Sequence, residues 1–65
     1  MEFKMGDKVR PLSIIPISNK EMMFENEDGN VIDIVPRTDG HYLIAVKRSY
    51  DGAIFKANEY LWEKV

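Results

Sequence analysis

The chain has 65 residues, of which 45% are hydrophobic and 31% are charged, and its formal net charge at neutral pH is −2. This composition is typical of a single small folded domain spanning residues 1–65, and it is too apolar for a disordered chain. The chain contains no cysteine, which excludes disulfide bonds and thiolate metal sites, and its slight acidity argues against a surface devoted to nucleic acid.

The apolar segments of the sequence are short. No apolar run approaches the roughly 18 residues of a membrane-spanning helix, and the first residues show no signal-peptide pattern. We therefore expect a cytoplasmic protein that has no membrane partner.

The amino-terminal part predicts a turn followed by a strand. Gly6 and Asp7 form a turn pair, and the residues after them alternate between polar and apolar. We place the first strand at Lys8–Leu12 and expect Val9, with either Leu12 or Ile14, to face the core.

The segment 11–28 allows two interpretations. In the first, Ser18 and Glu21 form a capping box that begins a short helix. In the second, Ile14–Ile17 and Met22–Phe24 are the two limbs of an irregular hairpin. We favour the hairpin because the apolar run is too short and too interrupted for a stable helix.

Two turn pairs, Asp28-Gly29 and Asp39-Gly40, frame the centre of the chain. The strand predicted between them, Val31–Val35, is almost entirely apolar, a pattern typical of a curved strand that serves both layers of a barrel. In the next strand, residues 42–48, alternation places three residues in the core: Tyr42, Ile44 and Val46.

The carboxyl-terminal part predicts a short strand at Ala53–Ala57, a 3₁₀ turn at Asn58–Leu61 and a closing strand at Trp62–Val65. Turn-forming glycines recur at similar intervals along the second half of the chain, at Gly29, Gly40 and Gly52. This spacing is typical of a small meandering barrel.

Four short patterns resemble those of SH3-like barrel domains, including bacterial, phage and KOW-type members. They are F-x-x-G-D-x-V-R at residues 3–10, G-x-V-x-x-I at residues 29–34, Y-L-I-x-V at residues 42–46 and F-x-x-x-E-x-L-x-x-x-V at residues 55–65. The resemblance implies an all-β fold, a five-stranded SH3-like barrel with a long loop between strands 1 and 2 and a 3₁₀ turn before the last strand. It does not extend to proline-rich ligands, because the chain lacks the aromatic loop segment of peptide-binding SH3 domains.

The residues that carry most enzyme chemistry are scarce. His41 is the only histidine, and we interpret it as an exposed residue that follows a turn. Ser18 or Ser49 can be combined with His41 and an aspartate on paper, but no nucleophile-elbow pattern accompanies them, and so small a chain leaves little room for a deep pocket. We expect no catalytic activity, no metal site and no cofactor.

The hydrophobic residues of the segment 11–28 give the leading functional hypothesis. A domain of this size has difficulty burying all of them, and methionine adapts well to irregular protein surfaces. Some of them can fill one end of the core, and the others would form a contact surface for a protein partner or for self-association. The candidate protein-binding residues are Ile14, Ile15, Ile17, Met22, Met23 and Phe24.

Basic and aromatic side chains near the two ends of the strand at residues 42–48 support an alternative hypothesis. Such side chains can hold phosphates while a ring stacks on a base, as in the recognition of single-stranded RNA or DNA. They can equally form the charged rim of a barrel. The candidate nucleic-acid-binding residues are Arg37, His41, Lys47, Arg48 and Tyr50, and a nucleic-acid partner is the less favoured of the two.

Overall fold

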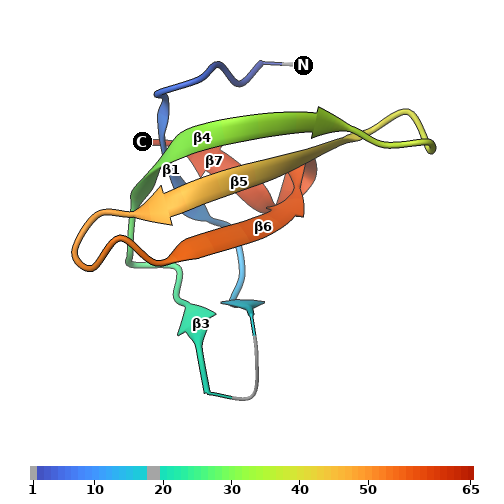
Figure 1. The fold of residues 1–65 in the computed structure, drawn as a ribbon. Helices are drawn as coiled ribbons and strands as arrows, with labels where there is room; N and C mark the ends of the chain where they lie inside the picture. Colours follow the sequence, from blue (N-terminus) through green and yellow to red (C-terminus); the bar gives the residue numbers. More distant parts are fainter. Residues whose placement is uncertain (1, 18–19) are drawn as a thin grey trace.

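The computed structural model describes residues 2–17 and 20–65, and it shows a five-stranded antiparallel sheet with a small two-stranded hairpin beside it (Figure 1). The strands of the large sheet, in spatial order, are β6 (Ile54–Asn58), β5 (Tyr42–Arg48), β4 (Gly29–Pro36), β1 (Lys8–Pro11) and β7 (Trp62–Lys64). The hairpin pairs β2 (Ile15–Pro16) with β3 (Met22–Met23), and a 3₁₀ turn, η1 (Glu59–Leu61), precedes β7. The predicted all-β fold and its 3₁₀ turn are confirmed.

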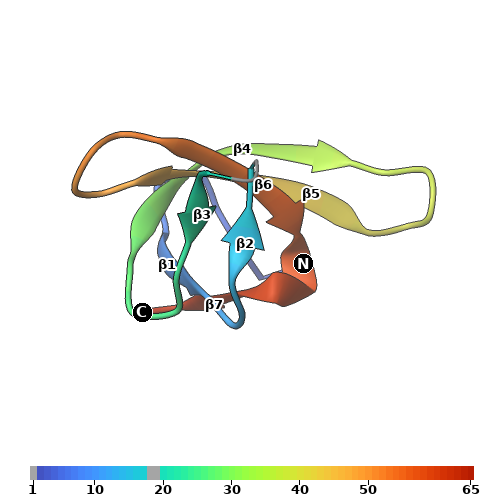
Figure 2. The same cartoon turned by 90° about the horizontal axis from the view of Figure 1, so that it is seen from below.

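The five-stranded sheet bends so that β1 and β7 lie beneath the layer formed by β4, β5 and β6, but it does not close into a barrel (Figure 2). Within the described residues, the edge strand β6 pairs only with β5, and the opposite edge strand β7 pairs only with β1. The closed barrel expected from the sequence is therefore corrected to an open sheet. Strand β7 has only three residues, which pair with β1 along one edge, and it follows β6 through the 3₁₀ turn η1 and not through a hairpin turn that would pair the two strands.

Strand β1 ends one residue earlier than expected and places a proline in the core. Alternation from Val9 continues to Pro11, and both residues are buried, whereas Leu12 and Ile14 are 50% and 48% exposed. The expectation that one of the latter two residues faces the core is wrong. Pro11 fits because it pairs only with Trp62 of β7, so no residue of β4 requires its missing N–H.

The segment between β1 and β4 contains a short hairpin. Ile15 pairs with Met23, and Pro16 pairs with Met22. This pairing confirms the hairpin interpretation for the described residues, while Ser18, the cap of the alternative helix, lies outside them.

A β-bulge explains the nearly unbroken apolar run in β4. Val31 pairs with Val46 and Asp33 pairs with Ala45, so the residue between Val31 and Asp33 is an extra one. The extra residue allows both Val31 and Ile34, three positions apart, to pack against the core on one side of the sheet. The curvature expected of this strand therefore has a local cause.

The core lies between the two layers and the hairpin. The expected core residues Ile44 and Val46 are buried, and Tyr42 packs against the core with part of its side chain exposed. The buried cluster consists of Phe3, Val9, Ile15, Met23, Val31, Ile44, Val46, Phe55, Ala57 and Trp62. The part of the chain that the structure describes contains no helix of the length and hydrophobicity needed to cross a membrane.

Strands β4 and β5 approach each other so closely at Gly29 that adding one methyl group there should lower the stability of the fold considerably. In Gly29→Ala the new Cβ overlaps the backbone oxygen of Lys47 and lies 2.7 Å from Cγ1 of Val46. Because a backbone atom cannot give way, we expect the free energy of unfolding to fall by about 3 kcal/mol. Urea denaturation measures this change.

Gly6→Ala is the matched control. Gly6 has a φ of +89° and open space around its Cα, so the substitution introduces backbone strain without a clash. We expect a loss of about 1 kcal/mol. Equal losses in the two variants would show that packing at Gly29 is not the constraint.

Candidate functional site

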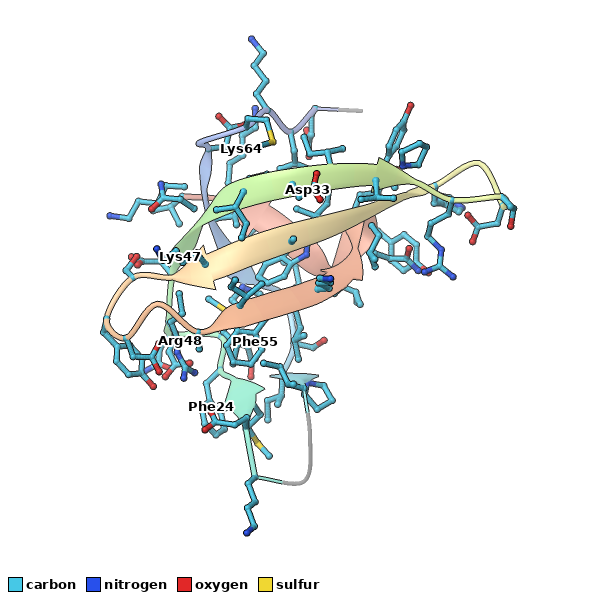
Figure 3. The ribbon with its side chains drawn as sticks, viewed as in Figure 1. Phe24, Asp33, Lys47, Arg48, Phe55 and Lys64 are labelled. Carbon is cyan, nitrogen blue, oxygen red and sulfur yellow. The ribbon has the colours of Figure 1, made fainter. Side chains whose placement is uncertain are left out.

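The position of the hairpin depends on Arg48, the last residue of β5, whose side chain is only 4% exposed. Its Nε and Nη2 donate to the two carboxylate oxygens of Asp51 at 2.9 and 2.7 Å. Its Nη1 donates to the backbone oxygen of Met22 at 3.0 Å and to Oε1 of Glu27 at 3.1 Å. One guanidinium therefore joins β3 and the segment after it to the turn that follows β5 (Figure 3).

Two aromatic rings complete the surroundings of Arg48. The guanidinium carbon lies 4.4 Å from the ring centre of Tyr50 and 4.8 Å from that of Phe55. Ring faces attract cations, and they do so more strongly where water is excluded. Phe55 is fully buried, so the charge is held against the core itself.

The ionisation of the neighbouring acids reflects this buried cation. Hydrogen bonds from Arg48 are the main reason why the pKa of Asp51 falls from its ordinary 3.8 to about 2. Burial opposes the ionisation of Glu27, but hydrogen bonds from the Phe24 amide and from Arg48 outweigh it, so the pKa of Glu27 is lowered. Hydrogen bonds to Asp51 in turn raise the pKa of Arg48.

The nucleic-acid-binding candidate Arg48 is 4% exposed, and its guanidinium lies against Asp51, Glu27 and the Met22 carbonyl. Of the other basic candidates, Arg37 has its Nε 3.6 Å from Oδ2 of Asp39, and Nδ1 of His41 is 3.7 Å from Oε1 of Glu59. These two basic residues are therefore already close to carboxylates.

The nucleic-acid-binding candidates also lie far apart. Arg37 and His41 precede β5, whereas Lys47 and Tyr50 lie at its opposite end (Figure 1). A strand of this length separates its ends by about 20 Å. The structure therefore does not bring the basic candidates into one site.

The apolar candidates divide into two groups. Ile15 and Met23 are core residues, with exposed fractions of 4% and 0%, so they are not available to a partner. Ile14, Ile17 and Phe24 are exposed, and Met22 is partly exposed.

The register of the hairpin gathers part of the exposed group on one face. Pro16 and Met22 are paired and lie opposite to the buried pair, because side chains alternate along each strand. Ile14 and Phe24 extend this face by one position on each strand, and both are exposed. We call these four residues the outer hairpin face: Ile14, Pro16, Met22 and Phe24.

The sequence analysis did not predict Pro16 as a site residue. Because side chains alternate along a strand, a buried Ile15 implies that its neighbour Pro16 faces outward. Leu12 was likewise missed and is exposed at the base of the hairpin segment. Its amide donates to the backbone oxygen of Leu61 in η1 at 2.9 Å.

Charge is concentrated around this hairpin. The segment 11–28 holds four acidic residues (Glu21, Glu25, Glu27 and Asp28) and one basic residue (Lys20), so the segment itself has a net charge of −3, whereas the whole chain has −2. Arg48 and Lys8 offset part of this charge through ion pairs with Glu21, Glu27 and Asp28. The outer hairpin face is therefore an uncharged apolar strip carried by the most acidic segment of the chain.

No protein-family model matches the sequence, and neither the curated proteins nor the solved structures contain a match.

The hydrogen bonds of Arg48 predict that its replacement lowers stability even when the positive charge is kept. Arg48→Lys keeps the positive charge but loses the planar fork that binds Asp51 through two nitrogens. We expect the free energy of unfolding to fall by about 2 kcal/mol, measured by urea denaturation.

Arg10→Lys serves as the control for that substitution. Arg10 forms an exposed ion pair with Glu63, with Nε and Oε1 2.7 Å apart, and such pairs contribute about 0–1 kcal/mol. A similar loss in both variants would contradict a special role for Arg48.

The lowered pKa values of Asp51 and Glu27 predict an acid-sensitive fold. Their contribution to stability is fully present above the ordinary carboxyl pKa values, and it is lost as pH falls towards the folded-state pKa of Asp51, about 2. We expect the thermal midpoint to fall between about pH 4 and about pH 2, and to fall less steeply in Asp51→Asn. An unchanged slope in that variant would remove Asp51 from the explanation.

Proposed function

We propose that this chain is a non-catalytic protein-binding module that uses the outer hairpin face to hold an apolar segment of a partner protein, flanked by basic residues. One observation carries the proposal: four neighbouring uncharged side chains face solvent on a hairpin whose opposite side is anchored in the core. Contiguous exposed apolar surface on a small domain is typical of interaction sites.

We further infer that the fold is an open variant of the SH3-like barrel. Three features support this inference: the β4-β5-β6 meander, the placement of β1 between β4 and β7, and the 3₁₀ turn before the last strand. In such a fold the long excursion after the first strand is the natural place for a binding surface, because excursions from a rigid scaffold carry much of protein recognition.

The anchoring of β2 and β3 in the core favours a binding role. Ile15 and Met23 are buried, and Arg48 holds the Met22 carbonyl and the Glu27 carboxylate. A contact surface that is already ordered loses less conformational entropy when a partner binds. The outer hairpin face therefore has the preorganisation that a weak, small interface requires.

Charge selects the type of partner. Two copies of the chain meeting through this face would bring two segments of net charge −3 together, and like charges oppose such contact. A partner with lysine or arginine beside its apolar residues meets complementary charge instead. We therefore place a basic partner ahead of self-association.

The alternative of nucleic-acid binding receives less support from the geometry. Its candidate Arg48 is buried, and the remaining basic residues lie at opposite ends of β5. Binding to a phosphate backbone would need a cluster of cations on one surface.

Selection of short peptides from a displayed random library tests the proposal directly. We expect enriched peptides to carry apolar residues flanked by lysine or arginine. We also expect Phe24→Ser to weaken their binding about tenfold, as loss of an aromatic anchor does. Fluorescence anisotropy measures both affinities.

Val35→Ser is the matched control, because Val35 is 43% exposed, like Phe24, but lies near the far end of β4. We expect this variant to keep the wild-type affinity. Equal weakening in both variants, or enrichment of peptides without basic residues, would contradict the proposal. A dimer detected by sedimentation and lost in Phe24→Ser would replace the basic partner with a second copy of the chain.

A further inference from the structure

A second candidate site lies away from the outer hairpin face, between the amino-terminal segment and η1. It is an open hollow of about 330 Å³ lined by Glu2, Phe3, Glu59 and Tyr60. We propose that this hollow binds an organic cation carrying an alkylammonium group. The proposal does not rest on the function suggested for the hairpin.

The first argument is the charge of the lining. Among residues 2–17 and 20–65, no lysine or arginine forms an ion pair with Glu2 or Glu59, and the basic group beside Glu59 is the imidazole of His41, whose Nδ1 lies 3.7 Å from Oε1. Glu59 has a side chain only 24% exposed, and its Oε2 is buried without a hydrogen-bond partner. A carboxylate withdrawn from water is stabilised by a nearby positive charge, which a bound ammonium ion would supply.

The second argument is the exposed ring of Tyr60. Phe3 also lines the hollow, but it is only 5% exposed and contributes a fixed apolar surface there. Tyr60 is held on two sides: its hydroxyl accepts a hydrogen bond from Nδ2 of Asn58 at 2.9 Å, and the ring of His41 meets it edge-on with centres 5.5 Å apart. Aromatic faces attract ammonium groups, and rings that are already positioned lose little freedom when a ligand binds.

The combination of ring and carboxylate selects the class of cation. A calcium or magnesium ion completes its oxygen shell with water and gains nothing from an aromatic ring. An alkylammonium group places its charge near the carboxylates and its carbon chain against the ring of Tyr60, so it uses both features of the hollow. The same group occurs in free amines and in the lysine side chain of a peptide.

Titration of the ¹⁵N-labelled chain with butylammonium chloride, at constant ionic strength, tests the site. We expect saturable shifts of the Phe3, Glu59 and Tyr60 amide signals with a dissociation constant of about a millimolar, as suits one exposed cation contact. 1-Butanol has the same carbon chain without the charge, and we expect it to leave these signals in place.

Three substitutions distinguish the contribution of the carboxylate from that of the aromatic ring. We expect Glu59→Gln and Tyr60→Leu each to weaken the binding of butylammonium at least about threefold, while Tyr60→Phe keeps most of the affinity. Glu63→Gln removes an acidic group on β7 that already pairs with Arg10, and it should bind as the wild type does. The dispersion of the remaining amide signals shows that each variant is folded.

The results that would overturn the proposal are equally specific. They are the absence of saturation at about 50 mM ligand, equal shifts with 1-butanol, or unchanged affinity in Glu59→Gln.

Repeating the titration with a blocked glycine-lysine-glycine peptide identifies the source of the ligand: tighter binding than butylammonium indicates a peptide lysine, and equal binding indicates a free amine. Phe24→Ser should bind butylammonium normally, which keeps this site independent of the outer hairpin face.

Discussion

The structure depends most on one buried guanidinium. Arg48 joins the end of β5 to the turn at Asp51, to the backbone of β3 and to Glu27, and it rests against Tyr50 and the core residue Phe55. A domain of this size buries a smaller fraction of its surface than a larger one, so apolar burial alone gives it little stability. A desolvated cation is expensive unless its donors are satisfied, and here the carboxylates and the Met22 carbonyl satisfy them.

The same link explains why the hairpin has two different faces. Because Arg48 fixes the backbone at Met22, the side chains of Ile15 and Met23 enter the core, and alternation then directs Pro16 and Met22 outward. The apolar residues of the outer face are therefore exposed by the register of the hairpin and not by disorder of a loop. The anchoring of the hairpin and the exposure of its outer face therefore both follow from the register of β2 with β3.

Much of the fold could be predicted from local signals. Turns at Gly40 and Gly52, both with positive φ, and the apolar run between them predict β5, and the short, interrupted apolar run of the segment 11–28 predicts the hairpin. The turn expected at Asp28-Gly29 is wrong, because Gly29 is the first residue of β4 and the turn before it lies at residues 25–26. The β-bulge after Val31 was not predictable, because it depends on the register with β5. The inward position of Pro11 is not predictable from the sequence, because proline normally avoids central strands. Proline is tolerated here because Pro11 pairs with β7 and with no residue of β4.

The role of Arg48 could not have been predicted in the same way. Alternation from Tyr42, Ile44 and Val46 places Arg48 on the core side of the sheet and Lys47 on the other, and the structure buries the first and exposes the second. The partners of Arg48 are not visible in the sequence, because Met22 and Glu27 lie more than twenty positions away and are brought to it by the topology. A charged residue opposite a protruding acidic segment is therefore a candidate for a structural ion pair before it is a candidate for a ligand contact.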